Sequence, residues 1–178
     1  DVAVTSLVVP TTAAVEQPVP ISVTVSNEGS YAEDVTLTVY NETTVIDTVL
    51  FSLAKGPTSK TSSFSWDTSG LSPGSYTINA TATIASDDEP GDNSATQSVT
   101  LSMVHDVAVT SLVVPTVGTV EQPVPISVNV KNNGTYDENV NLTVYHDTTV
   151  IDSKTFLLKK GLNNTVSFSW DTSGLSPG

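Results

Sequence analysis

The amino-acid sequence predicts an all-β protein made of two consecutive antiparallel β-sandwiches, the second of which is incomplete. Three observations support this fold class. The chain repeats itself with an offset of 105 residues, its short runs alternate apolar and polar residues, and no stretch follows the 3.6-residue period of an amphipathic helix. Alternation indicates strands buried on one face, because successive side chains point to opposite sides of a sheet.

The repeat defines the domain organisation. Residues 1–11 return unchanged at 106–116, and 39 of the 56 residues at 1–56 are identical to their counterparts at 106–161. One residue is then lost, and the sequence of 63–74 recurs intact up to residue 178. A period of this length suits a whole small domain rather than a solenoid repeat. We therefore expect domains at 1–104 and 105–178, the second without its last two strands.

Seven strands are expected in the first domain, each rich in Val, Ile or Thr and bounded by Gly, Pro or Asn clusters. They cover residues 2–9, 19–26, 35–40, 45–53, 61–66, 75–84 and 95–103. The second and third show the clearest alternation, with Ile21, Val23, Val25 and then Val35, Leu37, Val39 on one face. The segments 27–29 and 132–134 are expected to supply positive φ for hairpin turns.

Two details favour an immunoglobulin-like seven-stranded antiparallel β-sandwich. The sequence LSPGSY at Leu71–Tyr76 resembles a tyrosine corner, in which the hydroxyl of a tyrosine at the start of the sixth strand bonds to nearby backbone. Trp66 alternates with Phe64, which places its large apolar surface in the core, and Trp170 repeats it in the second copy. The chain has no cysteine, so packing must hold the sheets together.

The second repeat stops before the counterparts of residues 75–103. The sixth strand should be central, beside the third and seventh, so we expect an open sheet edge and an exposed core around Phe168 and Trp170. Two explanations remain open: the chain is a piece of a longer repetitive protein, or the strands arrive in trans from a neighbouring copy. Residues 75–178 also span one period. A third possibility is therefore a circularly permuted domain, in which residues 75–103 complete the second repeat. Between the repeats, the short connector 104–106 favours a stiff rod over a flexible tether.

Charge and composition exclude several classes of protein. The chain holds 19 Asp and Glu against 6 Lys and Arg, a net charge of -13, which argues against nucleic acid and against anionic membrane surfaces as partners. No apolar stretch approaches the roughly 20 residues that span a bilayer, so we expect no membrane insertion of this segment.

The loop before the last strand of the first repeat is a candidate calcium site. Its oxygen-bearing side chains suit a hard cation, although their spacing is not that of an EF-hand; they are Asp87, Asp88, Glu89, Asp92 and Asn93. The alternative is an ordinary solvated loop with a Pro-Gly turn. No other cofactor is expected.

Five Asn-X-Ser/Thr sequences are candidate glycosylation sites, with unmodified polar surface as the alternative. They are at Asn41, Asn79, Asn133, Asn141 and Asn163. We do not expect an enzyme, because His105 and His146 belong to no Ser-His-Asp set and the loops are too short to build a substrate cleft.

Taken in order, several segments resemble CARDB domains, adhesion-related modules of bacterial and archaeal surface proteins. These segments are DVAVTSL, VEQPVPISVTVSNEGSY, LTVY, FSW, PGSYTI and the acidic loop before the last strand. The resemblance implies an immunoglobulin-like fold, an extracellular setting and tandem arrays, and it carries no catalytic residues.

These observations lead to two hypotheses about function. The first is a structural and adhesive module of an extracellular cell-surface array, surface layer or filament, with strands donated between copies as one form of assembly. Its partners would be other copies, neighbouring repeats and surface glycans. The alternative is a spacer or carbohydrate-binding module of a secreted enzyme.

Overall fold

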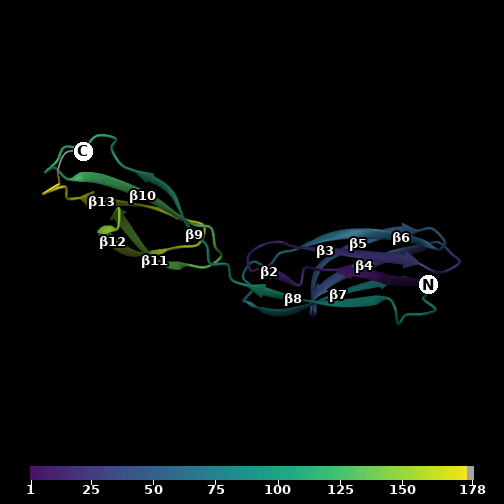
Figure 1. Cartoon of the computed structure of the whole chain (residues 1–178). Helices are drawn as coiled ribbons and strands as arrows, with labels where there is room; N and C mark the ends of the chain where they lie inside the picture. Colours follow the sequence, from purple (N-terminus) through teal and green to yellow (C-terminus); the bar gives the residue numbers. More distant parts are fainter. Residues whose placement is uncertain (176–178) are drawn as a thin grey trace. The chain divides into compact units, whose positions relative to one another are not determined.

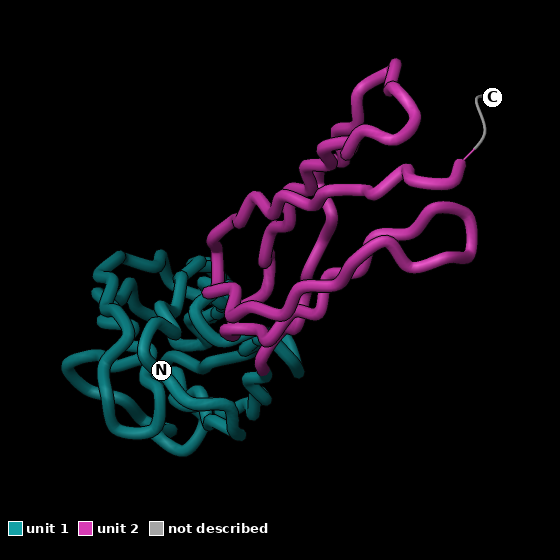
Figure 2. Tube along the Cα trace, turned by 90° about the vertical axis from the view of Figure 1, so that its left-hand side faces the viewer, with its two compact units in different colours: residues 1–102 teal, residues 103–178 magenta. Residues whose placement is uncertain are grey.

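The computed structural model describes residues 1–175, which contain strands and no helix. The chain divides into two compact units, residues 1–102 and 103–178, coloured separately in Figure 2. This division lies two residues before the boundary expected from the repeat. Within the described residues there is accordingly no helix long and apolar enough to cross a membrane.

Unit 1 is a sandwich of two sheets (Figure 1). One sheet has the order β1-β3-β6 and the other the order β2-β8-β7-β4-β5. The strands are β1 (Val2–Val8), β2 (Thr12–Ala14), β3 (Val19–Asn27), β4 (Glu33–Asn41), β5 (Thr44–Leu53), β6 (Thr58–Trp66), β7 (Gly74–Thr83) and β8 (Ser94–Ser102). All seven expected strands are present, and β7 lies between β4 and β8, as its central position in the expected topology required.

The additional strand is β2, which the sequence did not reveal. It has three residues and pairs in parallel with Thr100–Ser102 of β8. A run this short shows no alternation, and its pairing depends on a strand almost a full repeat further along the chain. Local sequence therefore contains little of the signal for β2.

The core of unit 1 lies between the inward faces of the two sheets. The alternating residues of β3 and β4 are all buried, and Trp66 at the end of β6 is buried with them. Strand β1 packs across this core against β7 and β8. The hydrophobic effect of burying these aliphatic side chains is the main stabilising term, since the chain has no disulfide.

The expectation of positive φ at 27–29 and 132–134 is wrong. Strands β3 and β4 belong to different sheets, so no hairpin turn joins them. Positive φ instead occurs at Glu42 (53°), in the β4–β5 hairpin. Gly29 has another role, because a Cβ atom there would lie 2.9 Å from the backbone nitrogen of Asp1.

Unit 2 repeats part of this plan. Its strands are β9 (Val107–Val113), β10 (Val124–Asn132), β11 (Glu138–His146), β12 (Thr149–Leu158) and β13 (Asn163–Trp170). They form a sheet of order β13-β10-β9 and a hairpin β11-β12. Residues 117–119, which correspond to β2, are not a strand. The described part of unit 2 has no counterpart of β8 for them to pair with.

The expectation that Phe168 and Trp170 would be exposed is wrong. Phe168 is buried in the core of unit 2, and the Nζ atom of Lys154 lies 5.1 Å from the centre of its ring. Trp170 is partly buried, and the ring of His146 stacks on it at 4.7 Å. The hairpin β11–β12 supplies these contacts, whereas four apolar residues of β9 are exposed: Val107, Val109, Leu112 and Val113.

Candidate functional site

The acidic loop 84–93 connects β7 to β8 and lies beside the start of β1. Asp87 Oδ2 accepts hydrogen bonds from the backbone N–H of Val2 (3.3 Å) and from Asn93 Nδ2 (3.0 Å). Asp87 Oδ1 accepts a bond from the backbone N–H of Glu89 (3.1 Å). The carboxylate therefore fastens the loop to the first strand of the sandwich.

These bonds also set the acidity of Asp87. Partial burial raises the pKa of the carboxyl group, but the bonds from the Asn93 side chain and from the backbone of Glu89 and Val2 outweigh it. The pKa of Asp87 is held below its ordinary value, because each donor stabilises the charged form. At neutral pH the Asp87 carboxylate is therefore ionised and holds the loop against the start of β1.

The other predicted members of the loop are placed differently. Asp88, Glu89 and Asp92 are exposed, whereas Asn93 is buried and its Oδ1 atom has no hydrogen-bond partner. The Oδ1 atom of Asp1, next to Val2, is also buried without a partner. Among residues 1–175, no three or more His, Cys, Asp or Glu side chains are arranged to hold a metal ion.

Sequence reasoning missed a second polar clamp, which is present in both units. Asn27 is fully buried at the end of β3, and its Nδ2 donates to the carbonyls of Tyr31 (2.7 Å) and Ala54 (3.0 Å). Its Oδ1 accepts from the N–H of Gly29 (2.9 Å). In unit 2, Asn132 makes the equivalent bonds to Tyr136 and Gly134, and its third bond goes to the carbonyl of Leu158, one residue before the counterpart of Ala54. The available signal was alternation, which puts Asn27 on the same face as the buried valines of β3.

A buried threonine closes the opposite end of β6 in the same way. Thr68 is fully buried, and its hydroxyl donates to the carbonyl of Gln17 (2.7 Å). Thr172 makes the corresponding bond to Gln122 (2.8 Å). These bonds satisfy backbone carbonyls of residues that lie just before β3 and β10.

The aromatic residues singled out in the sequence are structural. The Tyr76 hydroxyl donates to the carbonyl of Ser72 (2.7 Å), which is the geometry of a tyrosine corner. The ring of Tyr76 meets Trp66 edge-on, with centroids 5.6 Å apart. Trp66 is buried and Trp170 is covered by His146, so neither indole presents a free face for a sugar to stack on.

The five glycosylation candidates fall into two groups. Asn133, Asn141 and Asn163 of unit 2 are exposed. Asn41 and Asn79 of unit 1 are partly buried, and the Oδ1 atom of each is covered and has no hydrogen-bond partner.

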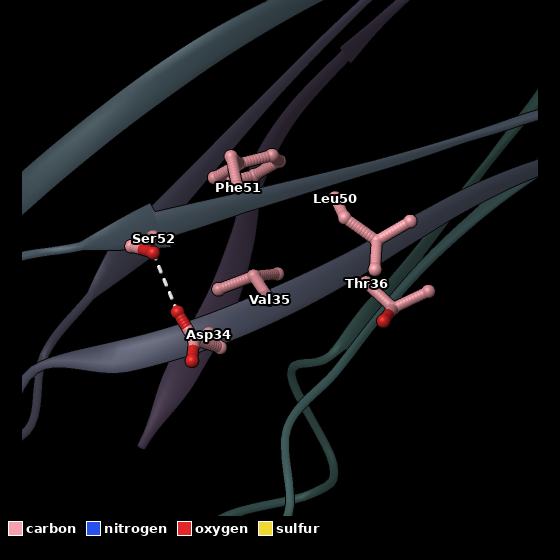
Figure 3. Close-up of a pocket in the computed structure, with 6 residues that line it drawn as sticks. All are labelled: Asp34, Val35, Thr36, Leu50, Phe51 and Ser52. Carbon is pink, nitrogen blue, oxygen red and sulfur yellow. Dashed lines mark hydrogen bonds between the residues drawn. The ribbon is translucent and has the colours of Figure 1, made fainter.

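A depression on β4 and β5 of about 330 Å³ is the site in Figure 3. It is lined by Asp34, Val35, Thr36, Leu50, Phe51 and Ser52. The Ser52 hydroxyl donates to the Asp34 carboxylate, and the two side chains point toward one another (Figure 3). A hydroxyl bonded to a carboxylate, with no histidine among the lining residues, does not form a nucleophile-base pair of the Ser-His-Asp kind.

The geometry defines the class of protein: two consecutive β-sandwich units fastened by repeated Asn and Thr clamps. The CARDB family model matches residues 1–89 and 104–178, so the chain belongs to the CARDB family. This confirms the resemblance seen in the sequence. CARDB is a family of non-enzymatic β-sandwich domains associated with cell-surface or adhesion-related proteins.

A crystal structure agrees with this assignment. The crystal structure of a Pyrococcus furiosus CARDB domain, in complex with di-metal ions, is 25% identical with a TM-score of 0.51. The match covers 57% of this chain and 88% of that one. A solution structure of the same domain is 27% identical with a TM-score of 0.49, covering 57% and 94%. The predicted immunoglobulin-like sandwich is confirmed. No curated protein sequence matched the chain significantly.

Proposed function

We propose that this chain is a structural and adhesive module of an extracellular protein, in which CARDB units follow one another as a cell-surface array, surface layer or filament. The observation that carries this proposal is the repetition itself. Two units of one family occur in a single chain, with 39 of 56 residues identical over their first halves. Such identity supports recent duplication inside a longer array.

The surface and the connector support the same proposal. A net charge of -13 on a chain rich in serine and threonine resists self-aggregation in a cation-rich exterior. The connector is also ordered: the Val104 N–H bonds to Thr135 Oγ1 (2.9 Å), and His105 pairs with Glu138. A module that transmits load along a chain benefits from a connector that is held by one of the units.

The second candidate is a spacer or carbohydrate-binding module of a secreted enzyme. Tyr31 and Tyr136 favour it, because both are exposed at equivalent positions of the two units. Exposed tyrosines give sugars a flat apolar surface with a polar edge. Binding of the chain to a panel of immobilised polysaccharides would support this alternative, provided that Tyr31→Ala and Tyr136→Ala remove it.

Cell-surface labelling tests the main proposal. Antibodies raised against residues 1–178 should label intact, unpermeabilised cells of the source organism, and the native protein should fractionate with the envelope. An antibody to a cytosolic protein controls for cell integrity. Labelling that requires permeabilisation would contradict the extracellular assignment, and recovery only in the medium with a catalytic domain attached would favour the second candidate.

Calcium binding by the loop 84–93 is a further proposal about unit 1. Its support is the pair of buried acceptors Asn93 Oδ1 and Asp1 Oδ1, which have no hydrogen-bond partner, together with the metal-bound CARDB domain from Pyrococcus furiosus. A bound cation would satisfy such oxygens. Calorimetric unfolding with calcium and with a chelator tests it, and an unchanged melting temperature would contradict it.

A further inference from the structure

The two units differ in one residue of the loop that leaves β3 in unit 1 and β10 in unit 2. Unit 1 has Glu28 before Gly29, whereas unit 2 has Asn133 before Gly134, which is the one Asn-Gly sequence in the chain. Asn-Gly is the dipeptide most prone to spontaneous deamidation, because glycine has no side chain to hinder its own backbone nitrogen. The Asn133 side chain is exposed to solvent. A reactive amide is therefore present in this loop of unit 2 and not in that of unit 1.

The deamidation reaction is intramolecular and needs only water. The Gly134 nitrogen loses its proton and attacks Cγ of Asn133, so that an N–Cγ bond forms, the Cγ–Nδ2 bond breaks and the side-chain nitrogen leaves as ammonia. Water then opens the resulting succinimide at one of its two carbonyl carbons. Attack at Cγ gives aspartate. Attack at the backbone carbonyl carbon gives isoaspartate, in which the main chain runs through Cγ and is longer by a methylene group.

In the folded unit the attacking nitrogen is already engaged. Gly134 is buried, and its N–H donates to Asn132 Oδ1 (2.8 Å) and to the carbonyl of Asp106 (3.2 Å). The Asn133 N–H donates to the same Asp106 carbonyl (2.8 Å), which fixes the backbone on both sides of the reactive side chain. Removing the proton from the Gly134 nitrogen and rotating that nitrogen onto Cγ both require these bonds to open, so the folded loop holds the two reacting atoms in an unproductive geometry.

The connector 104–106 supplies much of this restraint. Val104 is bonded to Thr135 twice, because the Thr135 N–H donates to the Val104 carbonyl (2.8 Å) and the Val104 N–H donates to Thr135 Oγ1 (2.9 Å). His105 pairs with Glu138, and its ring meets that of Tyr136 edge-on with centroids 5.4 Å apart. The connector therefore binds along the whole loop and immobilises the Asn-Gly peptide within it.

We propose that Asn133 is a site of spontaneous modification that is protected while the connector 104–106 is bound to the loop and becomes reactive when the connector detaches. The proposal goes beyond the proposed function and does not depend on it, because the chemistry requires only water. A reaction that proceeds only through a locally opened state is slowed in proportion to the population of that state. The extent of deamidation at Asn133 therefore records how often the connector leaves the loop.

The isoaspartate product prevents the connector from binding again. A Cβ atom at Gly134 would lie 2.3 Å from the backbone oxygen of Val104, so the loop and the connector are in direct backbone contact. A methylene group inserted before Gly134 displaces this backbone, and close packing leaves no room for the shift. The aspartate product is compatible with the fold, because unit 1 has the acidic Glu28 at the equivalent position and the Gly29 N–H keeps its bond to Asn27 Oδ1 (2.9 Å).

Timed incubation of the whole chain at neutral pH, followed by peptide mass spectrometry, measures the deamidation rate at Asn133. The chain is produced without glycans, because a sugar on Nδ2 would replace the leaving group. A peptide with the sequence of residues 130–138 gives the rate without the fold, and we expect the folded chain to react at least about tenfold more slowly.

Two variants loosen the connector without changing the Asn-Gly sequence. Thr135→Val removes the acceptor of the Val104 N–H, and His105→Ala removes the contacts with Glu138 and Tyr136. Each should accelerate deamidation of the folded chain at least about threefold. Thr143→Val is the matched control, because the Thr143 hydroxyl bonds to Ser153 and not to the connector, and it should leave the rate unchanged.

Amide hydrogen exchange tests the consequence of the modification. Chain enriched in isoaspartate at position 133 should exchange the amides of Val104 and Thr135 faster than the parent, whereas Asn133→Asp should exchange them at the parental rate. Equal deamidation of the folded chain and the peptide, no acceleration in either connector variant, or a connector loosened equally by Asn133→Asp would overturn the proposal. Circular dichroism confirms that each variant is folded, and His105→Ala decides the outcome if Thr135→Val is not, because the His105 side chain is 61% exposed. Cell-surface labelling is independent of these results.

Discussion

The side-chain hydroxyl of Tyr76 donates a 2.7 Å hydrogen bond to the backbone carbonyl of Ser72, which closes the turn that leads from β6 into β7. The bond fixes the start of β7, the strand that lies between β4 and β8. The ring of Tyr76 contacts Trp66. A hydrogen bond between residues only four apart in the sequence thus positions the central strand of the five-stranded sheet.

Tyr76→Phe should destabilise unit 1 by about 1 kcal/mol, because the ring still fits the core while the carbonyl of Ser72 loses its donor. Urea unfolding followed by Trp66 fluorescence, in a Trp170→Phe background, measures the loss. Tyr31→Phe is the control, since the Tyr31 side chain is exposed. Equal stability of Tyr76→Phe and the parent would show that the corner bond contributes nothing.

Asn27→Ala should cost about 3 kcal/mol of unit 1 stability. It removes the bonds that Asn27 donates to the carbonyls of Tyr31 and Ala54, of which Ala54 keeps a bond from the Thr58 hydroxyl. Burying an unsatisfied polar group of the backbone costs more than a hydrogen bond gains. The same unfolding assay applies, with the exposed neighbour Glu28→Ala as control. A loss no larger than that of the control would contradict the clamp.

Gly56→Ala should destabilise unit 1 by about 1–3 kcal/mol through steric overlap. The added Cβ would lie 2.3 Å from the backbone oxygen of Asn27, and backbone at a strand end has little room to move. Gly91→Ala is the matched control, because a Cβ there has no atom within 4 Å. The same melting temperature for both variants would contradict the close-packing explanation.

Acid should weaken unit 1 through Asp87. Its folded-state pKa is lowered, so its contribution to stability is present above the unfolded pKa of roughly 3.9 and is lost as the pH falls through the folded value. The stability difference between the parent and Asp87→Asn should therefore be greatest near neutrality and disappear at low pH. Comparing two variants cancels the titration of Asp67, whose pKa is lowered by its bonds to Ser69.

Asp88→Asn is the control for this pH series, because the Asp88 side chain is exposed. Its stability should follow that of the parent from neutral to acid pH. A parent-minus-Asp87→Asn difference that stays constant with pH would show that the Asp87 carboxylate does not act as an ionised clamp.

Glycan occupancy should follow exposure. We expect Asn133, Asn141 and Asn163 of native protein to be modified before Asn41 and Asn79, whose side-chain oxygens are covered. Glycopeptide mass spectrometry gives the occupancy at each site, and enzymatic deglycosylation provides the reference mass. Unmodified native protein, or glycans confined to Asn41 and Asn79, would contradict this prediction.

Much of the fold could be predicted because its signals are local or repeated. Alternation along β3 and β4 identifies the buried face residue by residue, and the 105-residue repeat separates the two units. The Tyr76 corner could also be recognised, since its donor and acceptor lie close together in the sequence. The Asn27 clamp was visible only in part: alternation points the side chain inward, but the carbonyl of Ala54 comes from a distant segment.

The amino-acid sequence by itself determined that both units are β-sandwiches, because side-chain alternation needs no knowledge of distant partners. Only the tertiary structure decided which of two identical valines is buried. Val2 and Val107 have the same neighbours in the sequence, yet β7 and β8 cover only the first. Burial is a property of the complete set of packed strands, and no local pattern contains it.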